Sequence, residues 1–249
     1  AKSPAVYQYR RHNQSMMAAS GRDTSYYALA GLANEPVTVI WPLSGRKKWL
    51  PRLMAWFETT AARRAGLGLH VFDFSGDADF GRDVRRWLAD RDCETAFTPI
   101  GGATPGLADA DRRDNLDTVR AVQRAMIRLY GQVRARAGGE WLLIVEDDVL
   151  PPVDAPEQLL RGLAADVACV SGAIRSRWER GRWIAWDARL ESITTRGRGL
   201  EQVHGTGFGC LLLRRSVLHA LPVHGGANGN YDHAFSASVA GAGWRWVLD

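Results

Sequence analysis

The sequence contains few cysteines and no long apolar run, and these absences limit where the protein can work. Its three cysteines among 249 residues, Cys93, Cys169 and Cys210, stand too far apart for a disulfide framework or a metal knuckle. A reducing compartment, the cytoplasm, therefore fits best. The sequence contains no stretch of 18 apolar residues, which is the length that predicts a transmembrane helix. The first residues also lack the apolar core of a signal peptide.

Lysine is scarce as well, because Lys2, Lys47 and Lys48 are the only lysines among 32 basic residues. The net charge of +5 is concentrated in residues 171–220, which hold nine arginines and four acidic residues. Arginine presents a planar fork that suits phosphate and carboxylate. The regional excess therefore indicates a site for an anionic partner. A GC-rich genome or a solvated basic loop would give the same pattern.

The length suits one large domain or two small ones. A hydrophobic fraction of 46% and a charged fraction of 24% are typical of a globular chain. We expect residues 1–35, which are polar and irregular, to form an N-terminal arm or lid. Residues 36–152 and 153–249 are expected to form two halves of one domain.

Strands and helices alternate along the chain. Short apolar runs predict strands at 37–43, 67–74, 93–100, 141–152, 167–174 and 244–249, and a strand followed by the start of a helix at 208–218. Helical spacing of apolar residues predicts helices at 49–65, 80–88, 116–137 and 231–240. This order favours an α/β fold with a mainly parallel, Rossmann-like sheet flanked by helices. Ligands bind beyond the carboxyl ends of such strands.

Three consecutive carboxylates, Glu146, Asp147 and Asp148, follow five apolar residues. Because like charges at close range repel, a cluster at the end of a buried strand requires a cation. Hard carboxylate oxygens suit Mn²⁺ or Mg²⁺. Alternate residues of a strand face the same way, so we expect Glu146 and Asp148 to share a site while Asp147 points aside. The alternative is a solvated turn with one acid capping a helix at 156–164.

The run WLLIVEDDVLPP resembles the metal-binding acidic motif, D-x-D, of GT-A glycosyltransferases, although it begins with Glu146. Five further segments resemble parts of that family in the same order. They are VTVIWPLSGR (first strand and nucleotide-contacting turn), VFDFSGDAD (second strand end), RRDNL (Arg-Asn segment), HGTGFGCLLLRRSVL (glycine-bearing acceptor segment) and NYDHAF (catalytic acid). Together they cover about residues 37–249. The chain is thus similar to family-2-like and mannan-polymerase-like nucleotide-sugar transferases.

This resemblance implies a metal-dependent glycosyltransferase that moves a sugar from a UDP- or GDP-sugar to an acceptor hydroxyl. Residues 36–152 would be the nucleotide-sugar-binding half and residues 153–249 the acceptor-binding half. Asp148 would bind the metal directly. Glu146 would bind the metal, a metal-bound water or the ribose, and Asp147 would support them.

Further site residues follow from the resemblance. Asp232 would be the general base of an inverting reaction, with a plain helix N-terminal carboxylate as the alternative. His204 and His233 could complete the metal shell. The other residues implied around the donor are Leu43, Ser44, Arg46, Asp73, Arg113, Asn115, Gly205 and Gly207.

Residues 175–201 combine three tryptophans with seven arginines. Aromatic faces stack on sugars or bases and arginine binds phosphate, so the acceptor could be a saccharide, a lipid-linked acceptor or a hydroxymethylated DNA base. Two other functions stay open. One is a sugar-phosphate nucleotidyltransferase, with residues 45–48 as its phosphate loop. The other is a non-catalytic nucleic-acid-binding module that uses residues 171–220.

Overall fold

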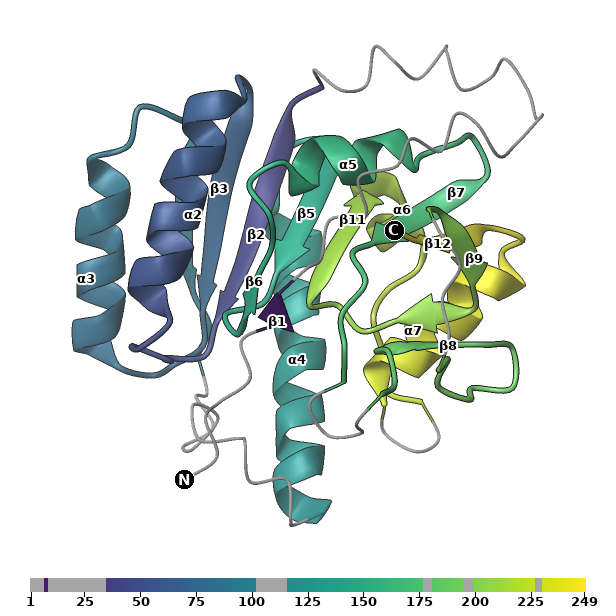
Figure 1. Cartoon of the computed structure of the whole chain (residues 1–249). Coiled ribbons are helices and arrows are strands. Elements are labelled where there is room, and N and C mark those ends of the chain that lie inside the picture. The colour runs from purple at the N-terminus through teal and green to yellow at the C-terminus, as the bar shows by residue number, and fades with distance from the viewer. Residues whose placement is uncertain (1–6, 9–34, 102–115, 177–180, 195–198, 227–229) are drawn as a thin grey trace.

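The computed structural model describes residues 7–8, 35–101, 116–176, 181–194, 199–226 and 230–249. At its centre lies an eight-stranded sheet in the order β4-β3-β2-β5-β11-β7-β12-β9 (Figure 1). In chain order its strands are β2 Val37–Leu43, β3 Leu67–Asp73, β4 Thr95–Pro99, β5 Trp141–Val145, β7 Val167–Ser171, β9 Glu201–Val203, β11 Cys210–Arg214 and β12 Arg245–Leu248.

The two halves of the sheet differ in strand direction. Strands β4, β3, β2 and β5 are parallel throughout, as crossover helices require. β11 then runs antiparallel to both β5 and β7, β12 is parallel to β7, and β9 closes the edge antiparallel to β12. The predicted α/β fold with a mainly parallel sheet is confirmed, with a mixed second half.

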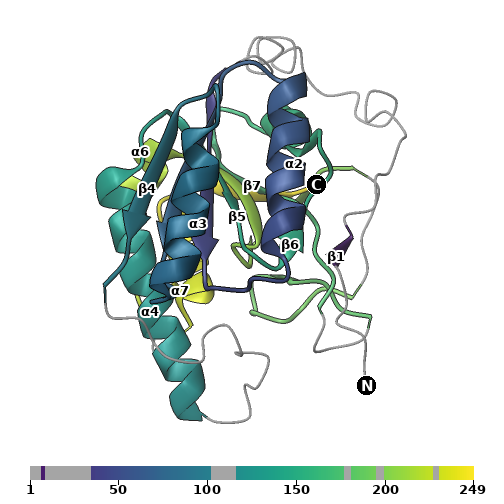
Figure 2. The ribbon, with the colours of Figure 1, turned by 90° about the vertical axis from the view of Figure 1, so that its left-hand side faces the viewer.

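Helices cover both faces of the sheet (Figure 2). Their bounds are α2 Leu50–Arg63, α3 Ala78–Ala89, α4 Leu116–Arg136, α5 Ala155–Arg161, α6 Arg215–Ala220 and α7 Tyr231–Gly241. One hydrophobic layer joins the sheet to α2, α3 and α5, and the other joins it to α4, α6 and α7. Strand alternation explains the division, because Val39 and Trp41 of β2 enter the first layer and Ile40 enters the second.

The long predicted strand at 141–152 is interrupted. β5 ends at Val145, a turn follows in which the Val149 amide donates to the Glu146 carbonyl at 3.0 Å, and the short strand β6 covers Val149–Leu150. The three acids therefore lie in a turn, and the expectation of one continuous strand is wrong.

Two small strand pairs lie beside the main sheet. β1, Tyr7–Gln8, pairs in parallel with β6, and β8, Ala185–Trp186, pairs antiparallel with β10, Gly205–Thr206. Of the predicted N-terminal arm, only β1 and Glu35 belong to the described residues. None of the described helices combines the length and the apolar character needed to cross a membrane.

Candidate active site

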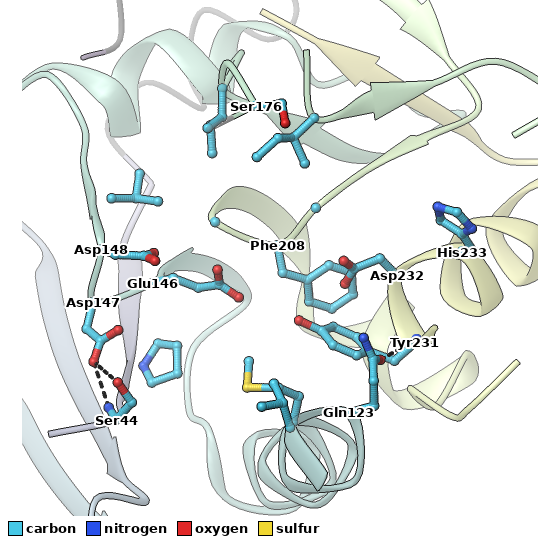
Figure 3. Close-up of a pocket in the computed structure, with 18 of the residues that line it drawn as sticks. Ser44, Gln123, Glu146, Asp147, Asp148, Ser176, Phe208, Tyr231, Asp232 and His233 are labelled. Carbon is cyan, nitrogen blue, oxygen red and sulfur yellow. Dashed lines mark hydrogen bonds between the residues drawn. The ribbon is translucent and has the colours of Figure 1, made fainter. Parts of the chain in front are cut away.

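A cavity of about 320 Å³ opens beyond the carboxyl ends of β2, β3 and β5. This is the edge at which parallel sheets bind ligands. The side of the cavity formed after β2 and β5 is called here the acidic wall, and it comprises Ser44, Arg46 and residues 146–148. The facing wall comprises Trp183, Trp186, Gly207 and residues 231–233. Figure 3 shows Tyr231, Asp232 and His233 of this wall opposite the acids.

Asp147 is the anchored acid of the acidic wall. Its Oδ2 accepts hydrogen bonds from the Ser44 amide at 2.7 Å and from the Ser44 hydroxyl at 2.6 Å, and its Oδ1 accepts one from Arg46 Nη1 at 2.5 Å. Figure 3 shows it turned toward Ser44, while Glu146 and Asp148 point into the cavity. The expected division of the three acids is therefore found, although a turn produces it. Asp147 joins the turn after β5 to the loop after β2.

The other interpretation of these acids, a solvated turn with a helix cap, does not fit. Asp147 is 5% exposed, and the N-cap residue of α5 is Asp154. Asp147 and Asp148 instead pair with a cation of the chain itself. Arg46 Nη1 lies 2.5 Å from Asp147 Oδ1 and 3.2 Å from Asp148 Oδ2. Burial lowers the pKa of the Arg46 guanidinium, but the carboxylates of Asp147 and Asp148 raise it above its ordinary value.

Glu146 carries the least balanced charge. Burial, followed by the charges of Asp148 and Asp232, raises its pKa from 4.5 to about 8, against the opposing effect of Arg46. A divalent cation would relieve this crowding, and carboxylate oxygens are the ligands that Mn²⁺ and Mg²⁺ prefer. Glu146 and Asp148 thus fit a metal that water and phosphate oxygens complete. The described residues contain no group of three or more His, Cys, Asp or Glu side chains suited to a metal.

On the facing wall, the first turn of α7 presents Asp232 to the cavity. The helix is capped by Asn230, whose side chain accepts from the amides of Asp232 at 3.0 Å and His233 at 3.4 Å. Gln123 of α4 accepts from the Tyr231 amide at 3.0 Å. Asp232 is therefore not the capping group. Its carboxylate lies close enough to Glu146 to contribute to the raised pKa of Glu146.

His233 packs its ring edge against Trp186, with the ring centroids 4.4 Å apart. Burial, and then the charge of His204, lower its pKa, so the imidazole is neutral at pH 7. Its Nδ1 is buried and makes no hydrogen bond within the described chain. His204 does not line the cavity, and its amide donates to the Trp186 carbonyl at 3.0 Å.

The two predicted glycines have different surroundings. Gly207 lines the cavity, and a Cβ there would lie 2.9 Å from Ile184 Cγ2 and 3.9 Å from Asp232 Oδ2. At Gly205 a Cβ would lie 1.9 Å from Ser236 Oγ. Gly205 therefore allows close packing against α7, whereas Gly207 allows close approach to the cavity.

Two further predicted residues, Leu43 and Asp73, are not part of the cavity lining. Leu43 is a core residue at 1% exposure, and Asp73 accepts from the Ser75 amide at 2.9 Å. Asp77 caps α3 and pairs with Lys47 at 2.8 Å. Arg113 and Asn115 lie outside the described residues. Neither Leu43 nor Asp73 lines the cavity.

Sequence reasoning missed several groups at this site, namely Gln123, Gly209, Asn230 and Tyr231. Gln123 and Asn230 act by accepting hydrogen bonds from backbone amides, a role that no sequence spacing predicts. Gly209 could have been found from the G-F-G run in the sequence. The structure shows why glycine is needed, because a Cβ there would lie 2.9 Å from Ile174 Cδ1 and 3.7 Å from Glu146 Oε2.

No protein-family model matches this chain, and no curated protein matches it by sequence. Among solved structures, it is similar to the mannosyltransferase PcManGT from Pyrobaculum calidifontis, solved in complex with GDP-Man and Mn²⁺, at 15% identity and a TM-score of 0.50. That match covers 90% of this chain but 63% of the mannosyltransferase. A second neighbour, residues 1–349 of S. aureus TarS, shows 11% identity over 86% of this chain and 58% of its own, at a TM-score of 0.48. The first likeness shows the fold, a GT-A-like α/β domain.

Proposed function

We propose that this protein is a metal-dependent glycosyltransferase that moves a sugar from a nucleotide-diphosphate sugar to an acceptor hydroxyl. The observation that carries the proposal is the cavity with carboxylates on both walls. Glu146 and Asp148 point into it from the turn after β5, and Asp232 points into it from α7 (Figure 3). The likeness of the fold to a mannosyltransferase that binds GDP-Man and Mn²⁺ supports it.

The donor diphosphate is assigned to the acidic wall. Asp148 and Glu146 would hold Mn²⁺ or Mg²⁺, which supplies electrostatic stabilisation of the negative charge that develops on the leaving diphosphate. Arg46 offers the diphosphate a planar cationic group. Asp147, Ser44 and Arg46 fix the loop after β2 in place, so the groups around the diphosphate are held before the donor binds. Leu43 and Asp73 would support this pocket from behind its lining.

Asp232 is assigned as the group that removes the proton from the acceptor hydroxyl in an inverting reaction. It stands on the wall opposite the metal-binding acids, where an attacking hydroxyl would enter. The helix N-terminus and the Asn230 cap fix its direction. In a retaining reaction this base is not required, so the anomeric configuration of the product, measured by NMR, tests the assignment.

The acceptor is assigned to the facing wall. Trp183 and Trp186 line it, and Arg175 stacks on Trp183 with its guanidinium 4.6 Å from the ring centroid. Aromatic faces beside a cation suit a sugar or a base that carries phosphate. The saccharide, lipid-linked and hydroxymethylated DNA acceptors remain predictions. Transfer assays with an oligosaccharide, a polyprenyl phosphate sugar and a hydroxymethylated oligonucleotide separate them.

Calorimetric titration of the protein with UDP- and GDP-sugars, with and without Mn²⁺, tests the proposal. We expect one donor to bind with an affinity at least about ten-fold higher when Mn²⁺ is present. Asp148→Asn should remove this metal dependence. Asp83→Asn, which changes an exposed acid of α3, is the matched control and should leave it intact. Equal affinities with and without metal for every donor would contradict the proposal.

Nucleotidyl transfer is tested in the same preparation by pyrophosphate release from a nucleoside triphosphate and a sugar phosphate. A phosphate-binding lysine would be expected for that chemistry. Lys47 is instead paired with Asp77, is 65% exposed along its side chain and does not line the cavity. Among the described residues, no lysine lines the cavity, so the lysine that this second function would need is not found there.

A further inference from the structure

Arg46 contacts the same carboxylate that the proposed metal needs. Its Nη1 lies 3.2 Å from Asp148 Oδ2 and 2.5 Å from Asp147 Oδ1, and the side chains of Arg46 and Asp148 are both 15% exposed. Asp147 is already bound by Ser44. Arg46 therefore bridges an anchored acid and an acid that faces the cavity.

The loop that carries Arg46 is held by other contacts. Asp147 binds the Ser44 amide and hydroxyl, and Lys47 pairs with Asp77 at 2.8 Å. Gly45, between them, has a φ of +93° and approaches Ser75 so closely that a Cβ would lie 2.9 Å from Ser75 Cβ. Because these anchors do not involve Asp148, the guanidinium can leave Asp148 without unfolding the loop.

A divalent cation on Asp148 would stand close to the guanidinium, and two positive charges in a partly buried site repel each other strongly. A nucleoside diphosphate changes this balance, because its phosphates offer the guanidinium a bidentate anionic partner. The same phosphates complete the shell of the cation.

We infer, on the basis of the proposed function, that Arg46 is the resident counter-ion of Asp148 and couples metal binding to nucleotide binding. Without nucleotide, its guanidinium competes with Mn²⁺ for Asp148. With nucleotide, it turns to the diphosphate and gives the carboxylate to the metal. Arg46 is thus a positioning residue that favours loading of cation and donor together.

Mn²⁺ binding, followed by the electron paramagnetic resonance signal of the free ion, tests the competition directly. We expect Arg46→Gln to bind Mn²⁺ alone about ten-fold more tightly than the wild type. Metal-free GDP should bind about ten-fold more weakly to this variant in calorimetry, because the phosphate loses its partner. Lost packing would not raise Mn²⁺ affinity, so the gain separates competition from a merely structural role.

Three further variants complete the experiment. Arg46→Ala, in which water can replace the guanidinium beside Asp147, should show the same gain and carries the test where Arg46→Gln fails to fold. Arg46→Lys keeps the positive charge and should stay near the wild-type Mn²⁺ affinity. Lys47→Gln removes the neighbouring charge, which pairs with Asp77 instead, and should change Mn²⁺ affinity by less than about two-fold.

The possible failures are distinguishable. If the wild type binds GDP with Mn²⁺ but neither neutral variant of Arg46 gains affinity for Mn²⁺, the inference is wrong and the proposed function stands. Unchanged metal-free GDP binding in a folded neutral variant would also overturn the coupling. If the wild type shows no Mn²⁺-dependent binding to any nucleotide or nucleotide sugar, the proposed function fails, and the inference fails with it.

Discussion

On the acidic wall, side chains hold one another through charge, whereas on the facing wall backbone amides and rings set the position of each group. Asp147 binds Arg46 and Ser44, and Arg46 in turn binds Asp148. The first turn of α7, whose amides donate to the Asn230 side chain, positions Asp232. The ring of Trp186 positions His233. Changes on the acidic wall should therefore affect stability and donor binding together, while a change of the Asp232 carboxylate on the facing wall should affect catalysis alone.

The largest effect is expected at Asp232. In an inverting reaction, Asp232→Asn should lower turnover by about 10²- to 10⁴-fold, the usual contribution of a general base. Donor affinity and the melting temperature should stay near wild type, because the carboxylate is not the cap of α7. Nucleotide release from the donor measures turnover, calorimetry measures donor affinity, and thermal melting measures stability. A large loss of stability would contradict the separation of the two walls.

The next effect is expected at Asp147. Asp147→Asn leaves the buried Arg46 without its closest anion, so the free energy of unfolding should fall by about 3 kcal/mol. Ser44→Ala is the graded control and should cost about 1 kcal/mol, the contribution of one hydrogen bond. Urea denaturation measures both. Equal, small losses would show that charge does not hold this wall together.

A smaller effect, of opposite sign, is expected at Glu146. Its folded pKa of about 8 exceeds the ordinary value of 4.5, so the folded state keeps a proton that the unfolded state releases. Stability is therefore lost as the pH rises from 4.5 toward 8. In the absence of metal, Glu146→Gln should be more stable than the wild type at pH 8, by an amount on the order of a few kcal/mol, with little gain at pH 4.5.

Urea denaturation at the two pH values checks this, and the same variant should lose metal-dependent donor binding. A gain in stability that does not change with pH would mean that the pKa of Glu146 is not raised in the folded state.

The smallest effect is expected at the cap of α7. Asn230→Ala should cost about 1 kcal/mol of stability and should also lower turnover several-fold by loosening Asp232. Asp77→Ala removes a side-chain cap from α3, at a similar cost but away from the cavity lining. If both variants lower turnover equally, the cap does not direct the base.

The sequence predicted the order of elements well where apolar periodicity was strong. The runs at 37–43 and 67–74 became β2 and β3, and the predicted helices at 49–65 and 80–88 became α2 and α3 within a few residues. The break after Val145 was missed, because the apolar runs WLLIV and VL on either side of the acids were interpreted as one strand. In the structure the two runs pair with different strands, β5 with β2 and β11 and β6 with β1.

At the site, the three acids were found because consecutive carboxylates at the end of a buried strand repel one another unless a cation balances them. The alternation of side chains also predicted that Asp147 would point aside, but the partner of Asp147 was not visible. Nothing in the sequence indicates that Ser44 binds Asp147, because that contact depends on the positions of two loops that follow β2 and β5. The segment rich in arginine and tryptophan was recognised, but which of its rings line the cavity depends on an irregular hairpin with no period to follow.

The contact between Ser44 and Asp147 joins residues that are 103 positions apart in the chain. It joins the loops that follow β2 and β5, which pair in parallel although α2, β3, α3, β4 and α4 lie between them in the chain. Such long-range contacts are made late in folding, since the entropy of closing the loop must be overcome first. Weakening this contact should therefore speed unfolding and leave the folding rate nearly unchanged. We therefore expect the corner of the molecule that holds the proposed metal site to be among the last parts to assemble during folding.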